Sequence, residues 1–99
     1  MQVRMARAKG LDAGDAKFAA SFGDRLKKLR SDAGLDATAL GQRCGMTQAA
    51  MWRLEAGKAL PTLRTLARLA IALEVPITEL LVDVDYQDVR LVNRPYEPR

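Results

Sequence analysis

The chain has 99 residues, of which 48% are apolar and 5% aromatic, and this fits one small domain with a thin core. It holds no histidine and a single cysteine, Cys44, which excludes a tetrahedral zinc site, a histidine-based catalytic triad and an intramolecular disulfide. The formal net charge is +4, and the positive excess lies in residues 1–58, with eleven Lys and Arg against six Asp and Glu, which favours a polyanionic partner.

The N-terminal residues, MQVRMARAKG, alternate charged with small side chains and lack the apolar stretch of a signal peptide. No apolar run approaches transmembrane length, so we expect a cytoplasmic protein without membrane association. Residues 1–17 are interpreted as a flexible basic arm. In a reduced cytoplasm Cys44 is expected to be a small buried apolar residue, with a redox-sensing thiol as the alternative.

Apolar residues at helical spacing predict a first helix, one face of which carries Phe18, Phe22, Leu26, Leu29 and Ala33. Ser21 and Asp24 resemble a capping box, so the helix is expected to begin there or a turn earlier, near Asp15. Gly34 ends it, because glycine tolerates the left-handed conformation. The opposite face is interpreted as solvated surface and carries Arg25, Lys27 and Lys28.

Two short helices are predicted next. Asp36 is the expected N-cap of the second helix, which ends at Gly45, and Thr47 is the expected N-cap of the third. The inward positions of the two helices are Leu40, Cys44, Met51 and Leu54. The outward face of the third helix carries Gln48, Ala49, Trp52 and Arg53.

A fourth helix is predicted after Gly57, with Thr62 as its N-cap. Its expected inward residues are Leu63, Leu66, Ala70 and Leu73. Arg64 and Arg68 are expected to point away from the core. Pro76 breaks the chain, and residues 77–81 are predicted to form a short fifth helix.

The tail, residues 82–99, begins with apolar residues that alternate with polar ones, which indicates a strand. Val82, Tyr86 and Val89 also fit a helical spacing, but the β-branched content favours the strand. A lone element with an apolar face needs a partner, and a second copy of the chain would supply one. We therefore predict a homodimer assembled through residues 77–81 and the tail.

The segment 39–57, ALGQRCGMTQAAMWRLEAG, resembles the helix-turn-helix motif of the Cro/cI-type regulators, also called the xenobiotic-response-element (XRE) family. The apolar positions of that motif are occupied by Leu40, Cys44, Met46, Met51 and Leu54. Gly41 and Gly45 stand where the two helices cross and turn. The resemblance covers residues 23–81 and implies an all-α, compact, five-helix, lambda-repressor-like DNA-binding domain, here residues 18–81.

The resemblance also implies a partly buried ion pair between Arg30 and Glu55, which would join the first helix to the third. Two positions depart from the family pattern. Ala37 stands where relatives often have a glutamine that bonds a DNA phosphate, and Glu74 stands where they usually have glycine.

The third helix, residues 48–55, is the expected recognition helix, because an α-helix fits the major groove of DNA. The expected base-reading residues are Gln48, Ala49, Trp52 and Arg53, since Gln pairs with adenine, Arg with guanine and an alanine methyl with the thymine methyl. For Trp52, packing on a dimer partner or on Arg side chains is an equal alternative. The expected phosphate contacts come from Thr38, Arg43, Thr47, Lys58 and Arg64.

The predicted function is sequence-specific transcriptional regulation, as a repressor that binds a two-fold operator in double-stranded DNA as a homodimer. The alternatives are an activator that contacts polymerase, a controller protein of a restriction–modification system, and an antitoxin. The antitoxin would bind a toxin through residues 1–17 or 86–99 and repress its own operon. No enzymatic activity, cofactor, metal or small-molecule ligand is expected, and DNA binding implies association with the nucleoid.

Overall fold

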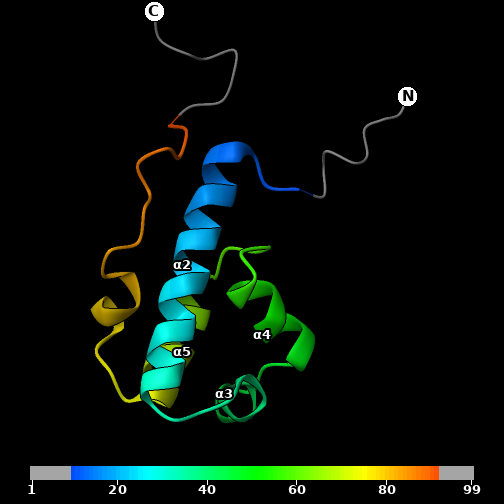
Figure 1. The fold of residues 1–99 in the computed structure, drawn as a ribbon, viewed down its shortest axis with the longest axis vertical. Coiled ribbons are helices and arrows are strands. Elements are labelled where there is room, and N and C mark those ends of the chain that lie inside the picture. The colour runs from blue at the N-terminus through cyan, green and yellow to red at the C-terminus, as the bar shows by residue number, and fades with distance from the viewer. Residues whose placement is uncertain (1–9, 92–99) are drawn as a thin grey trace, which may run out of the picture.

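The computed structural model describes residues 10–91, which fold into helices joined by short loops (Figure 1). The elements are α2 (Ala13–Asp32), α3 (Ala37–Cys44), α4 (Gln48–Glu55), α5 (Leu63–Leu73) and the 3-10 helix η1 (Ile77–Leu81). Across residues 10–91 none of these helices has the length and apolarity that crossing a bilayer requires. The all-α prediction is confirmed, although the expected fifth α-helix is a 3-10 helix.

Helix α2 begins at Ala13, close to the earlier of the two predicted starts. The Asp12 carboxylate accepts a hydrogen bond from the backbone N–H of Asp15 at 2.8 Å and so caps the helix at Ala13. The Ser21 hydroxyl, expected to cap a helix, lies inside α2 and accepts a hydrogen bond from the backbone N–H of Asp85 at 2.7 Å. Residues 13–17, which the sequence placed in the N-terminal arm, are therefore helical.

The predicted caps of the other α-helices form. The side chains of Asp36, Thr47 and Thr62 accept backbone N–H groups three residues ahead, at 2.8, 3.0 and 3.1 Å. Helix α5 ends differently, because Glu74 adopts the left-handed conformation with φ of 59°. This is the position where glycine was expected from the resemblance, so the turn keeps its shape at a cost in backbone strain.

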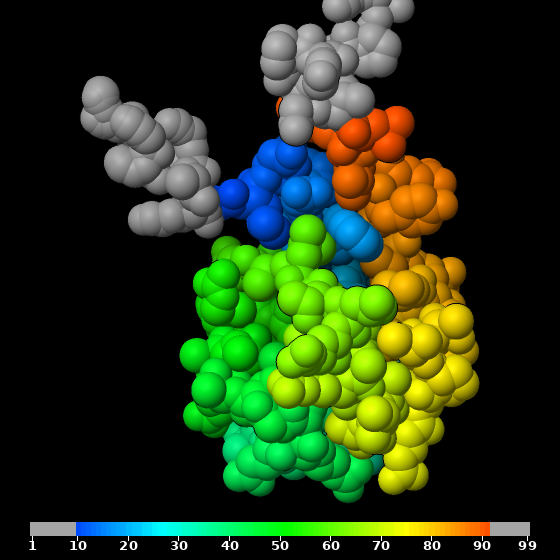
Figure 2. Space-filling view, turned by 180° about the vertical axis from the view of Figure 1, so that it is seen from behind, coloured from blue at the N-terminus to red at the C-terminus, as the bar shows by residue number. Residues whose placement is uncertain are grey.

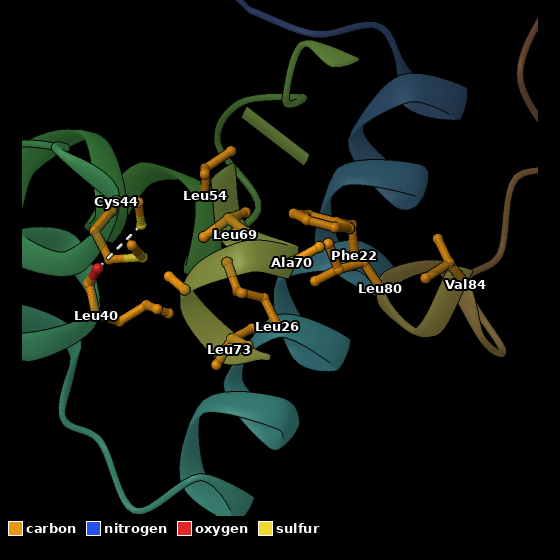
Figure 3. Close-up of a cluster of buried hydrophobic side chains, with 12 residues drawn as sticks. Phe22, Leu26, Leu40, Cys44, Leu54, Leu69, Ala70, Leu73, Leu80 and Val84 are labelled. Carbon is orange, nitrogen blue, oxygen red and sulfur yellow. Dashed lines mark hydrogen bonds between the residues drawn. The ribbon is translucent and has the colours of Figure 1, made fainter. Parts of the chain in front are cut away.

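The core lies where α2 and α5 meet the other elements. Helix α4 packs on one side of α2 and η1 on the other, while α3 packs against α4 and α5 (Figure 1). Phe22 and Leu26 of α2 lie at the centre of this cluster with Leu69 of α5, and Leu40 and Cys44 extend it toward α3 (Figure 3). The fully buried large side chains are Phe22, Leu26, Leu40, Met51, Leu69 and Leu80.

The inward face of α5 differs in part from the prediction. Leu69 is fully buried, although the sequence did not place it inward, and Leu63 is 75% exposed. Leu63 is the first residue of α5 and lies beyond the edge of the core, whereas Leu69, Ala70 and Leu73 form a continuous buried stripe at helical spacing.

Arg25 is also not the solvated residue that its position suggested. Its Nε donates to the backbone carbonyl of Glu79 at 2.7 Å, and its Nη2 lies 3.0 Å from the Glu79 carboxylate. The Arg25 side chain is only 15% exposed. It therefore fastens η1 to α2, whereas Lys27 and Lys28 are solvent-exposed as expected.

The first part of the tail, residues 82–91, contains turns and no strand, which corrects the strand prediction. This segment lies against the first turns of α2 (Figure 1). Val84 is buried in the core, and the Lys17 amine lies 2.8 Å from the Asp88 carboxylate, a bond that raises the pKa of Lys17. The segment finds its partner within its own chain, so its apolar residue needs no strand pairing. The rest of the predicted tail lies outside the described residues.

Cys44 is a buried side chain of the α3 face of the core. Its thiol donates to the backbone carbonyl of Leu40 at 3.0 Å, and burial raises the pKa of the thiol. Both features keep the sulfur neutral and enclosed, which supports the packing role over a redox-sensing one.

Candidate nucleic-acid interface

Helix α4 separates a buried face from an exposed one. Met51 and Leu54 anchor the inner face in the core, and Thr47 fixes the first turn by accepting the N–H of Ala50. The residues predicted to read bases are all solvent-exposed on the other side: Gln48, Ala49, Trp52 and Arg53. Trp52 is 60% exposed, so most of its side chain lies outside the core. The helix thus presents these four side chains on one surface that other molecules can reach.

The turn between α3 and α4 sets the angle of the exposed helix. Gly45 adopts φ of 69° and ends α3 in the left-handed conformation. A Cβ atom on Gly41 would lie 3.2 Å from the backbone carbonyl oxygen of Met46, so a larger residue would push the turn away from α3. Gly41 and Gly45 therefore allow the close crossing and the tight turn that the helix-turn-helix motif requires.

An ion pair holds the other end of α4 to α2. The Arg30 guanidinium contacts Glu55 through two bonds, Nε to Oε2 at 2.6 Å and Nη2 to Oε1 at 3.0 Å, and its Nη1 donates to the carbonyl of Leu35. The side chains are 18% and 10% exposed. The pair predicted by resemblance is thus present and also reaches the loop before α3.

The crossing of α2 and α4 depends on a glycine whose role the sequence reading missed. A Cβ atom on Gly23 would lie 2.6 Å from the backbone carbonyl oxygen of Glu55 and 2.7 Å from that of Leu54. The helices could not approach this closely with any other residue at that position. A glycine inside an otherwise strong helical pattern was the available signal.

The Gln48 side chain on the exposed face of α4 is hydrogen-bonded to α3. Its amide Nε2 donates to the hydroxyl of Thr38 in the first turn of α3, at 2.8 Å. This bond restricts the Gln48 rotamer and links a predicted base-reading residue to a predicted phosphate contact. Because an amide nitrogen carries two hydrogens, a second donor remains on Nε2 alongside the acceptor Oε1.

The other predicted phosphate contacts differ in their surroundings. Arg43 donates from Nη1 to the carbonyl of Ala72 near the end of α5, at 3.1 Å, a structural bond that the sequence did not indicate. Lys58 and Arg64 are solvent-exposed beside α4 and on α5. Arg53 makes a long contact of 3.4 Å to the Lys58 carbonyl. Figure 2 shows α3 and α4, in green, along one edge of the molecule, away from the orange tail segment.

Comparison with known proteins identifies this arrangement. The sequence pattern of the family described as "Helix-turn-helix domain" matches residues 21–81. Over 81 residues the chain is 33% identical to the HTH-type transcriptional repressor RghR of Bacillus subtilis (strain 168), a match that covers 80% of this chain. The chain belongs to the XRE-type helix-turn-helix regulators. It spans 60% of the length of this curated relative.

Two solved structures resemble this XRE-type regulator. The restriction-modification controller protein C.AhdI from Aeromonas hydrophila matches with a TM-score of 0.61 and 31% identity, over 63% of this chain and 94% of the controller. An HTH_3 family transcriptional regulator from Vibrio cholerae matches with a TM-score of 0.65 and 32% identity, over 74% of this chain and 40% of that protein. The regulator is thus a DNA-binding protein of the helix-turn-helix class.

Proposed function

We propose that this XRE-type regulator is a transcriptional repressor that binds a two-fold operator as a homodimer and inserts α4 into the major groove. The observation that carries the proposal is the exposed face of α4, with Gln48, Ala49, Trp52 and Arg53 presented together. Its opposite face is locked by Met51, Leu54 and the Glu55 ion pair. A rigid helix with polar and aromatic side chains outward is what base reading requires.

Each exposed side chain has a chemical role in this proposal. Gln48 has a donor and an acceptor for adenine N7 and N6, and its bond to Thr38 reduces the entropy lost when it binds. Arg53 reaches guanine O6 and N7 after giving up a long contact to the loop, which costs little. Ala49 offers a methyl group to the base edges.

Phosphate contacts would position the dimer without reading sequence. Thr38, Thr47, Lys58 and Arg64 are exposed, and we assign them this role. Arg43 is assigned a smaller part, because a phosphate contact would compete with its bond to the Ala72 carbonyl. Ala37 cannot make the phosphate bond of the glutamine that relatives often carry. We therefore assign the phosphate contact at that end of α3 to the hydroxyl of the neighbouring Thr38.

The dimer interface is proposed at η1. Ile77, Leu81 and Val82 form an exposed apolar group there. Leu81→Asp should shift the protein from dimer to monomer in sedimentation velocity, whereas Leu63→Asp, at an equally apolar exposed site on α5, should leave the dimer intact. Removing the whole tail is a poorer test, because Val84 belongs to the core. A Leu81→Asp protein that remains a dimer would contradict this interface.

Selection of bound sequences from a random double-stranded DNA pool tests the function. A repressor of this kind should enrich one inverted repeat, with half-sites about 10–10.5 base pairs apart. Placing the recovered sequence upstream of a reporter gene should then lower its expression when the regulator is present. A pool without any enriched sequence would contradict the proposal.

A controller role in a restriction–modification system is the second candidate, favoured by the similarity to C.AhdI over most of that protein's length. The two roles differ in the genes that carry the operator. A recovered site upstream of the regulator's own gene and a neighbouring nuclease gene would favour the controller role, and a site upstream of other genes would favour a separate repressor.

A further inference from the structure

The exposed face of α4 is hollowed on the side that faces α3. The hollow is lined by Ala37 and Thr38 from the first turn of α3 and by Gln48, Ala49, Trp52 and Glu55 from α4. It therefore lies between the end of α3 assigned to a phosphate and the helix assigned to the groove.

Several polar atoms around this hollow are engaged within the domain. The Gln48 amide donates to Thr38, and both carboxylate oxygens of Glu55 accept from Arg30. The remaining wall consists of two alanine methyl groups and the Trp52 ring, which is 60% exposed. An apolar wall of this kind gains free energy by covering a small apolar group, whereas a charged group placed against the alanine methyl groups would lose hydration.

We propose that this hollow receives the C5-methyl group of a pyrimidine in the major groove, either thymine or 5-methylcytosine, and that Trp52 is the residue that makes the site selective for that methyl. The inference rests on the proposed function. In the unmodified major groove the thymine methyl is the apolar group that the base edges offer. A methyl contact also explains why α4 carries a large exposed aromatic ring among polar residues, since the ring is then covered only when DNA is bound.

The test uses the duplex recovered by selection from the random pool. Each thymine of a half-site is replaced, one symmetric pair at a time, by deoxyuridine, which removes the methyl and nothing else. One pair should weaken binding about four-fold per half-site, or roughly fifteen-fold for the dimer, because covering one methyl-sized group contributes about that factor. At the same position cytosine should bind worse than 5-methylcytosine, which separates the methyl from the identity of the base.

Variants connect the methyl effect to Trp52. Trp52→Ala should reduce the loss on deoxyuridine substitution to less than about two-fold per half-site, and Trp52→Phe should retain most of it, because the phenyl ring preserves the apolar wall. Arg53→Ala is the matched control: Arg53 is exposed on the same helix but does not line this hollow. It should weaken binding overall and preserve the deoxyuridine ratio. Circular dichroism of each variant checks that α4 is intact.

The outcomes separate the two proposals. An enriched operator with no deoxyuridine-sensitive position overturns the methyl site and leaves the repressor function standing, as does a Trp52→Ala protein with undiminished sensitivity. A pool that yields no preferred sequence overturns the proposed function and the methyl site with it. A sensitive position that loses its effect in Trp52→Ala supports both.

Discussion

Arg30 on α2 and Glu55 at the end of α4 form a two-bond ion pair across 25 residues of sequence, with Nε–Oε2 at 2.6 Å and Nη2–Oε1 at 3.0 Å. The same guanidinium holds the carbonyl of Leu35, just before α3. One side chain therefore fixes both helices of the helix-turn-helix motif against α2. The orientation of α4 depends on this contact as well as on the apolar core.

Removal of one partner should be costly, because the other charge would remain largely buried and unpaired. Glu55→Ala or Arg30→Ala should each lower the free energy of unfolding by about 3–5 kcal/mol in urea denaturation. Lys28→Ala is the control, since Lys28 and Asp32 form an exposed i, i+4 pair, and its effect should stay below about 0.5 kcal/mol. Similar small losses for all three variants would show that the buried pair is not structural.

The contact of Arg25 with η1 should also contribute measurably to the free energy of unfolding. Arg25→Ala removes two bonds to Glu79, one of them to its backbone carbonyl, from a side chain that is 15% exposed. We expect a loss of about 1.5–3 kcal/mol in the free energy of unfolding. Lys27→Ala, on an exposed part of the same helix, should change it by less than about 0.5 kcal/mol. An Arg25→Ala protein as stable as Lys27→Ala would argue against the anchor.

Glu74 occupies a backbone conformation that favours glycine, with φ of 59°. Glu74→Gly should therefore raise the free energy of unfolding by about 0.5–1 kcal/mol, because relief of strain exceeds the added freedom of the unfolded chain. Ala67→Gly in the interior of α5 should have the opposite sign, with a loss of about 1 kcal/mol. Thermal unfolding of the two proteins side by side decides the matter, and destabilisation by Glu74→Gly would refute the strain argument.

The buried thiol of Cys44 gives a pH-dependent prediction. Burial raises its pKa above the ordinary value of 9.0, so the folded state holds the proton more firmly than the unfolded state. This contribution to stability is complete below pH 9 and is lost as the pH rises through the folded pKa. Iodoacetamide at pH 8 should alkylate Cys44 slowly in native protein and rapidly in urea. Rapid alkylation of the native protein would instead favour a redox-sensing thiol.

The local features of the fold could be predicted from the sequence because their causes are local. Asp36, Thr47 and Thr62 cap helices within three residues, and Gly45 ends one by its own conformation. The Arg30–Glu55 pair was predicted only through resemblance, since nothing in the spacing of two residues 25 apart requires contact.

The errors lie where distant segments decide the structure. Arg25 looked like solvated surface because its partner, Glu79, lies 54 residues away on η1. The alternating pattern that begins at Val82 suited a strand, but α2 extends back to Ala13 and offers the segment a surface along its own chain. Periodicity identifies an apolar face without identifying what covers it.

In the proposed complex α4 reads bases, and residues beside it contact phosphates. The affinity of Arg53→Ala and Lys58→Ala for the selected operator and for random duplex DNA distinguishes these two roles. Arg53→Ala should lose about 1–3 kcal/mol of discrimination between the two, whereas Lys58→Ala should weaken both alike. Equal loss on operator and random DNA for Arg53→Ala would contradict base reading by α4.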